Sequence, residues 1–170
     1  MRKGKTTVKE AFYGRIHEAV TVRPWLQKTV MAAAKLLPLC VYVCYPLMLA
    51  YLMIYDREYL AEAVVYPAAG FLSVTMLRAG INAPRPYETM NLPPITPKET
   101  RGKSFPSRHA ACAGVIAVTA LKVLPPVGVL LSALAVGIAV SRVLSGVHYI
   151  RDVVAGLLFG AVIGWIGLFA

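Results

Sequence analysis

The stretch LLPLCVYVCYPLMLAYLMIY, from Leu36 to Tyr55, contains 20 consecutive residues without a charge. A helix of about 20 apolar residues is long enough to cross the hydrocarbon core of a bilayer, which is about 30 Å thick. A helix buried in a soluble protein can be equally apolar. One such stretch is therefore compatible with a transmembrane helix and with a buried helix of a soluble protein. The rest of the chain distinguishes between these two.

The composition of the whole chain favours the membrane. Of its 170 residues, 58% are hydrophobic and 15% are charged, and the mean hydropathy is +0.62. So few polar residues cannot cover the surface of a soluble domain, and so apolar a chain is not disordered. The formal net charge is +10. In an apolar chain this excess indicates contact with anionic lipid or phosphate rather than with nucleic acid.

Five segments with almost no charge predict about five transmembrane helices. They cover roughly residues 30–55, 59–77, 106–124, 126–141 and 153–170. The third has the shortest uncharged run and has to continue through Lys122, whose long side chain can reach the membrane interface. Five such segments in one short chain predict an all-α, multi-pass transmembrane helical bundle. Gly156, Gly160 and Gly164, spaced by four residues, predict close packing of the last helix against another.

The first 28 residues differ from the rest of the chain. Val8, Phe12, Ile16 and Ala19 recur at helical spacing among basic residues. This pattern predicts an amphipathic helix that lies at the membrane interface, and a disordered basic tail is the alternative. We therefore divide the chain into a basic amphipathic interfacial segment over 1–28 and a membrane-embedded domain over 29–170.

Polar residues border the predicted spans in the segments 78–86, 106–109 and 141–152. Ionisable residues at membrane depth are costly, so each is a candidate for function. If the spans alternate in direction, all three segments emerge at the same end of the bundle. The sequence therefore predicts a single polar site there.

The residue types in these segments predict an anion site. Arg78, Arg85 and Arg142 carry planar guanidinium groups whose N–H groups match phosphate oxygens. The residues just before Ser107 indicate the start of a helix. Ser107 and the neighbouring backbone N–H groups would then add donors at the positive end of the helix dipole.

Two histidines and a carboxylate can act on a bound phosphate. His148 and Asp152 are one helical turn apart, so Asp152 can accept the imidazole N–H and leave the other nitrogen free to face phosphorus. His109 can then protonate the leaving oxygen. Carboxylates are few near these segments, and zinc needs a closer set of His and Cys ligands. We therefore expect no metal and no other cofactor.

The three segments resemble the signature of the type 2 phosphatidic acid phosphatase superfamily, the integral-membrane lipid phosphate phosphatases. The third motif of that family, Ser-Arg, five residues, His, three residues, Asp, is complete over 141–152. The first motif has its Arg-Pro pair at 85–86, with Arg78 where lysine is usual. The second reads Pro-Ser-Arg-His, with Arg108 in place of glycine. The resemblance covers about residues 59–170.

This resemblance implies a role for each site residue. His148 would form a phosphohistidine intermediate, Asp152 would orient it, and His109 would act first as general acid and then as base. The implied phosphate contacts come from Arg78, Arg85, Ser107, Arg142 and the backbone of Arg108. The implied activity is metal-independent hydrolysis of a lipid phosphomonoester or diphosphate, such as a polyprenyl (di)phosphate, phosphatidate or phosphatidylglycerophosphate.

Two other functions fit some of these features. A non-catalytic lipid-head-group binder or transporter could retain the same anion site without hydrolysis. Vanadate-dependent haloperoxidases share the oxyanion motifs, but they are soluble. We expect the partners of this chain to be a lipid phosphate in the bilayer and an anionic membrane surface, and not nucleic acid.

The location of the site follows from the basic residues. With five spans, the amino terminus lies on the side of the site, and its many Lys and Arg residues predict that this side of the cell membrane is cytoplasmic. The long segment 86–105 is rich in Pro and Thr. We expect either a flap that brings Lys98, Arg101 and Lys103 near an anion, or a plain solvated linker.

Overall fold

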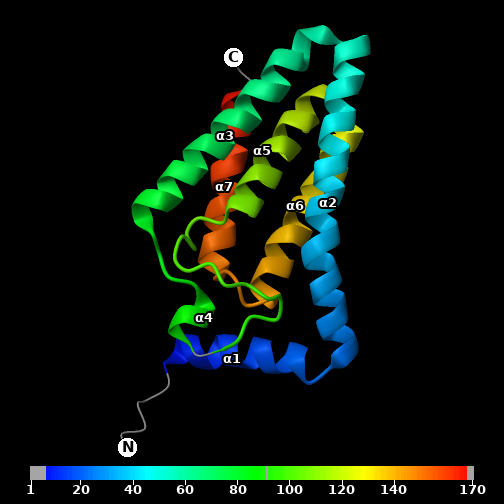
Figure 1. Cartoon of the computed structure of the whole chain (residues 1–170). Coiled ribbons are helices and arrows are strands. Elements are labelled where there is room, and N and C mark those ends of the chain that lie inside the picture. The colour runs from blue at the N-terminus through cyan, green and yellow to red at the C-terminus, as the bar shows by residue number, and fades with distance from the viewer. Residues whose placement is uncertain (1–6, 91, 168–170) are drawn as a thin grey trace, which may run out of the picture.

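The structure is a computed structural model that describes residues 7–90 and 92–167. In these ranges all regular secondary structure is helical, which confirms the all-α prediction. The helices are α1 (Val8–Thr21), α2 (Pro24–Tyr55), a 3₁₀ turn (Arg57–Tyr59), α3 (Leu60–Ile81), α4 (Pro86–Thr89), α5 (Arg108–Val123), α6 (Pro125–Leu144) and α7 (Ile150–Ile166). The long helices form a bundle, and α1 lies across one end of it, close to α4 (Figure 1).

The outer surface of the bundle is apolar. Large apolar side chains such as Leu47, Met76, Val129 and Leu158 are exposed on four different helices. Within the described ranges, three segments are long and apolar enough to cross a bilayer: Pro24–Tyr55, Arg57–Thr89 and Pro125–Leu144. An apolar exterior on a helical bundle is what a bilayer requires, and the multi-pass transmembrane fold is confirmed.

The other two predicted spans correspond to α5 and α7, which have 16 and 17 described residues. The helix α5 lies among α3, α6 and α7 and is buried along most of its length. It therefore faces protein more than lipid, and small residues such as Ala and Gly replace the long apolar side chains of a lipid-facing span. This position explains why its uncharged run is the shortest of the five.

The predicted glycine stripe packs α7 against α5. A Cβ atom placed on Gly156 would lie 2.5 Å from the carbonyl oxygen of Ser107, and one on Gly160 would overlap the carbonyl oxygen of Ala111. The two helix backbones can approach this closely only because these positions lack side chains. The stripe thus brings the first turns of α5 and α7 together at the end of the bundle that carries the predicted site.

The amino-terminal helix is also at this end. The backbone N–H of Ile150 donates to the Tyr13 hydroxyl at 2.9 Å, and the His17 Nε2 lies 2.9 Å from the carbonyl oxygen of Pro93. The helix itself is confirmed, and its location at a membrane interface stays a prediction. The first six residues of the predicted segment lie outside the described residues.

The close contact between α5 and α7 can be tested with Gly160→Ala. We expect this variant to lose about 1–3 kcal/mol of stability, because the added methyl group forces the two helices apart. Thermal unfolding in detergent would measure the loss. Gly80→Ala is the matched control, since a Cβ on this helical glycine meets no atom within 4 Å. Equal melting temperatures for the two variants would contradict the tight α5–α7 contact.

Candidate active site

The three polar segments meet at one end of the bundle, as their alternating directions predict. They surround a cavity of about 250 Å³, here called the arginine cavity, whose lining includes Arg78, Arg85, Arg108, His109 and His148. The other three predicted residues, Ser107, Arg142 and Asp152, do not line it but are buried nearby. The structure therefore brings all eight predicted residues to one region, with five of them at the cavity.

The link between α6 and α7 delivers His148 to this cavity. The backbone N–H groups of Val147 and His148 both donate to the carbonyl oxygen of Arg142 at 3.3 Å. The turn contains Gly146 at φ +72°, a conformation that glycine adopts without strain. The five residues between Arg142 and His148 therefore form a tight reversal. Only about 2% of the His148 surface remains exposed.

The contact between His148 and Asp152 differs from the prediction. His148 precedes α7, so the two side chains do not face each other across one turn of a helix. The distance from His148 Nδ1 to Asp152 Oδ2 is 3.6 Å, which is too long for a direct hydrogen bond. The Ser104 hydroxyl donates to Asp152 Oδ2 at 2.5 Å and lies 3.4 Å from His148 Nδ1. Ser104 therefore bridges the imidazole and the carboxylate.

Asp152 is held by the start of its own helix. The backbone N–H of Tyr149 donates to Asp152 Oδ2 at 3.0 Å, which is the capping contact of α7. The carbonyl oxygen of Asp152 in turn accepts the backbone N–H of Ser107 at 2.7 Å. The second and third motifs are thus joined by a main-chain hydrogen bond, and the carboxylate is fixed beside His148.

Sequence reasoning did not single out Ser104 as a site residue. It is fully buried and contacts side chains more than 40 positions later in the chain. A serine next to the Pro-Ser-Arg-His segment was the available signal. That signal is weak, because a serine before a helix is usually part of a turn or a cap.

The environment of His148 favours its neutral form. The pKa of His148 is lowered to about 4, mainly by burial and also by the charge of Arg85, against the opposing effect of Asp152. Near pH 7 the imidazole therefore carries a lone pair. Because Nδ1 faces Ser104 and Asp152, that lone pair is available on Nε2 if the proton is on Nδ1.

The two arginines of the first motif line the cavity and also form hydrogen bonds to the surrounding loops. Arg78 donates to the carbonyl oxygens of Pro106, at 3.1 Å, and Lys103. Arg85 donates to the carbonyl oxygens of Gly102 and Val147, at 3.0 and 3.1 Å. Each guanidinium thus joins its own segment to another one. These contacts satisfy charges that would be costly to bury unpaired.

Arg142 and Ser107 have polar atoms that the protein leaves unsatisfied. Arg142 donates through Nη2 to the carbonyl oxygen of Ala34 in α2 at 3.2 Å, while its buried Nε has no partner among the described residues. The buried Ser107 hydroxyl has no partner in that part of the chain either, and it does not cap α5. Buried polar atoms without a partner are rare, and these two lie close to the arginine cavity without lining it.

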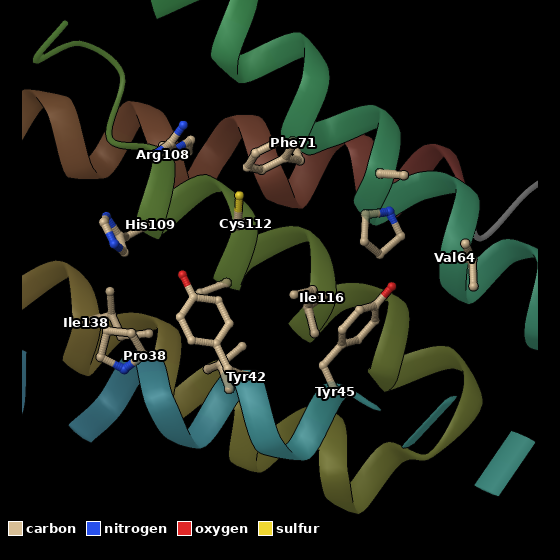
Figure 2. Close-up of a pocket in the computed structure, with 14 residues that line it drawn as sticks. Pro38, Tyr42, Tyr45, Val64, Phe71, Arg108, His109, Cys112, Ile116 and Ile138 are labelled. Carbon is tan, nitrogen blue, oxygen red and sulfur yellow. The ribbon is translucent and has the colours of Figure 1, made fainter. Parts of the chain in front are cut away.

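A second cavity adjoins the first. It has a volume of about 440 Å³, lies between α2, α3 and α5, and is lined mainly by apolar side chains such as Tyr45, Phe71 and Ile116 (Figure 2). We call it the apolar cavity. Arg108 and His109 line both cavities, and the Arg108 guanidinium lies 5.5 Å from the centre of the Phe71 ring. A polar space and an apolar space therefore meet at His109.

Within residues 7–90 and 92–167, no three His, Cys, Asp or Glu side chains gather as a metal-binding group. The donors at the arginine cavity are cationic or imidazole groups, which suit an anion better than a divalent cation. The arrangement can bind a phosphate, present a neutral imidazole to it, and place a second imidazole beside an apolar substituent.

The sequence has a direct match among known families. The model of the PAP2 superfamily matches residues 58–169, which is most of the chain. The chain belongs to the PAP2 superfamily. The resemblance stated from the three motifs is thereby confirmed, with nearly the same boundaries.

Individual relatives can be compared with the chain over defined lengths. The lipid A 1-phosphatase of Rhizobium etli is 32% identical over 114 residues, which cover 65% of this chain and 47% of that protein. The match thus spans about half the length of this curated relative. The crystal structure of LpxE from Aquifex aeolicus has a TM-score of 0.75 and 26% identity, with all of both chains covered.

A second solved structure also matches. It is a transmembrane PAP2-type phosphatidylglycerolphosphate phosphatase from Bacillus subtilis, with a TM-score of 0.64 and 25% identity over 96% of this chain and 86% of that one. This second neighbour is a PAP2-type protein by name, which agrees with the family of the chain.

The bridge formed by Ser104 gives a kinetic prediction. We expect Ser104→Ala to lower kcat of lipid phosphate hydrolysis about 10-fold to 100-fold with little change in KM, because a hydrogen bond to a charged group contributes about 1.5–3 kcal/mol. The control is Ser132→Ala, which removes a hydroxyl bonded only to its own helix, at the Gly128 carbonyl. An unchanged kcat in Ser104→Ala would show that Asp152 orients His148 without the serine.

Proposed function

We propose that this PAP2 protein hydrolyses a lipid phosphomonoester or diphosphate through a phosphohistidine intermediate on His148. The observation that carries this proposal is the junction of the two cavities at His109. A phosphate fits the arginine cavity, a hydrocarbon chain fits the apolar cavity, and the ester oxygen between them then lies next to His109. A soluble phosphate ester would not need the apolar cavity.

The first step is transfer of the phosphoryl group. The neutral His148 forms a bond to phosphorus while the bond from phosphorus to the lipid oxygen breaks, and His109 gives a proton to that oxygen. In the second step His109 takes a proton from water, the water oxygen attacks phosphorus, and the bond to His148 breaks. The products are inorganic phosphate and, from a phosphomonoester, the lipid alcohol. From a diphosphate the second product is the lipid monophosphate, and the oxygen that His109 protonates is then that of the departing phosphate.

The cationic groups would stabilise the charge on the transferred phosphoryl oxygens. Arg78 and Arg85 line the cavity and are oriented by their bonds to backbone carbonyls. The unsatisfied Nε of Arg142 and the hydroxyl of Ser107 supply further donors close by. Fixed donors of this kind cost little reorganisation during the reaction, which is why they favour the transition state.

An assay has to identify the substrate, because the phosphate that the three motifs would bind is common to all of these lipids. The relatives act, by name, on lipid A and on phosphatidylglycerophosphate. We propose a panel that contains these two lipids together with phosphatidate and a polyprenyl diphosphate. Each combines an anionic group with hydrocarbon, as the two adjoining cavities require.

The proposal is tested by phosphate release from this panel in detergent with a chelator present. We expect the wild type to release phosphate, and His148→Ala to lose turnover by about a thousandfold or more, because it removes the nucleophile. His109→Ala should also lose turnover, because it removes the group that protonates the leaving oxygen and then activates water. Lipid binding by the wild type without release would instead favour a head-group binder or transporter.

We also propose that the site faces the cytoplasm of a cell-membrane protein. The amino-terminal helix lies at the site end of the bundle, and it carries Lys9 and Arg15, whereas the opposite end has Arg57 and the Lys122–Glu62 ion pair. Segments with an excess of Lys and Arg usually stay on the cytoplasmic side of the membrane.

The orientation can be measured by labelling a cysteine in the loop before α5. Glu99→Cys, in a background with the three native cysteines replaced by alanine, should resist a membrane-impermeant thiol reagent in intact cells and react after permeabilisation. Glu99 is exposed, so access is not limited by the fold. Labelling of intact cells would place the site on the outer face.

A further inference from the structure

The loop that connects α4 to α5 is fixed to the rest of the protein before Lys98. The Ile95 side chain is buried in a small cluster with Val20 and Val30. The backbone N–H of Ile95 donates to the carbonyl oxygen of Ser145 at 3.0 Å. This part of the loop is therefore anchored to α1, α2 and the link between α6 and α7.

The loop is fixed again after Lys98. The N–H of Gly102 donates to Glu88 Oε1 at 2.8 Å, and the N–H of Ser104 donates to the carbonyl oxygen of Ala83 at 2.8 Å. With anchors at 95 and 102, the segment between them cannot swing freely. The structure thus favours a flap over the solvated linker that was the other expectation.

Lys98 lies between two cavities. It lines the arginine cavity, and it also lines a polar cavity of about 570 Å³ together with Glu88, Glu99 and Arg101. We call the latter the outer cavity. The side chain of Lys98 is half-buried, although a lysine on a loop is usually solvated. The flap therefore brings an ammonium group to the rim of the candidate active site.

This ammonium has no anionic partner in the part of the chain that the structure describes. No carboxylate oxygen of residues 7–90 or 92–167 lies within 4.0 Å of Lys98 Nζ. Glu88, which shares the outer cavity, already accepts the backbone N–H groups of Arg85 and Gly102. The charges that act on Lys98 most are cations, from Arg85, Arg142, Arg78 and Arg108.

Burial, together with the charges of the four arginines, lowers the pKa of Lys98 to about 8. A cation held near other cations costs free energy unless an anion joins them. The arginines also have part of their donor capacity committed, because Arg78 and Arg85 each bond two backbone carbonyls. The three N–H groups of Lys98 form no hydrogen bond to a described residue.

We propose that Lys98 is a phosphate-binding residue, carried by the flap, which contacts the phosphoryl group of the substrate and of released inorganic phosphate. This inference rests on the proposed function, and it adds a ligand from outside the three motifs. A lysine suits this task because its charge sits on a flexible four-carbon chain and can follow a phosphate that changes from ester to free anion.

The test compares Lys98→Met with the wild type in the phosphate-release assay. We expect KM for the lipid phosphate and Ki for inorganic phosphate both to rise about 10-fold to 100-fold, since one charge-assisted hydrogen bond is lost. Lys98→Arg, which keeps the charge, should restore most of the affinity. The matched control is Lys28→Met, which removes an exposed lysine that lines none of the described cavities.

The dependence on pH separates binding from a purely structural role. As pH rises through 8, free Lys98 loses its proton, so KM of the wild type should increase, whereas KM of Lys98→Arg should stay level over the same range. The other ionisable groups that line its cavities or act on it are Arg78, Arg85, Arg101, Lys103, Arg108, Arg142, Tyr87, Glu88, Glu99, His109 and His148. Identical pH profiles for the two proteins would overturn the inference.

Other outcomes are equally decisive. Wild-type KM and Ki in Lys98→Met would refute the assignment, and so would a rise in KM alone, because it would place Lys98 at the rest of the lipid head group. If the wild type releases no phosphate from any lipid, the proposed function fails. Calorimetric titration of inorganic phosphate into the wild type and Lys98→Met would then still support or refute the binding residue.

Discussion

The close packing of α5 against α7 is the contact on which the site depends. Gly156 and Gly160 leave room for the backbone of α5, and the Ser107 N–H reaches the carbonyl oxygen of Asp152 at 2.7 Å. This single approach places the helix that carries His109 beside the helix that carries Asp152. A bulkier residue in the stripe would separate two motifs that are far apart in the sequence, since lipid-embedded helices rely on close packing for their association.

Burial of several guanidinium groups next to one another would be unfavourable without compensation. In this protein the compensation comes from backbone carbonyls: Pro106 for Arg78, Val147 for Arg85 and Ala34 for Arg142. The same bonds tie the loops to the bundle. The charges that suit a phosphate therefore also shape the cavity, and a change at one arginine should affect both binding and local structure.

The two cavities match the two parts of a lipid phosphate. The arginine cavity is bounded by cations and imidazoles, and the apolar cavity by side chains from α2, α3 and α5, with Arg108 and His109 at the boundary (Figure 2). Membership of the PAP2 superfamily agrees with this division. Arg108, which stands where the family motif has glycine, places its guanidinium 5.5 Å from the centre of the Phe71 ring.

The sequence alone determined the helical bundle, the end of it at which the polar segments meet, and the three motifs, because apolar length and charge spacing act locally along the chain. Only the tertiary structure decided that Ser104 bridges His148 and Asp152 across 3.4 and 2.5 Å, and that Lys98 reaches the arginine cavity. The Ser104 contacts join residues more than 40 positions apart. Both features depend on how closely helices pack and where a loop is anchored, which no local pattern specifies.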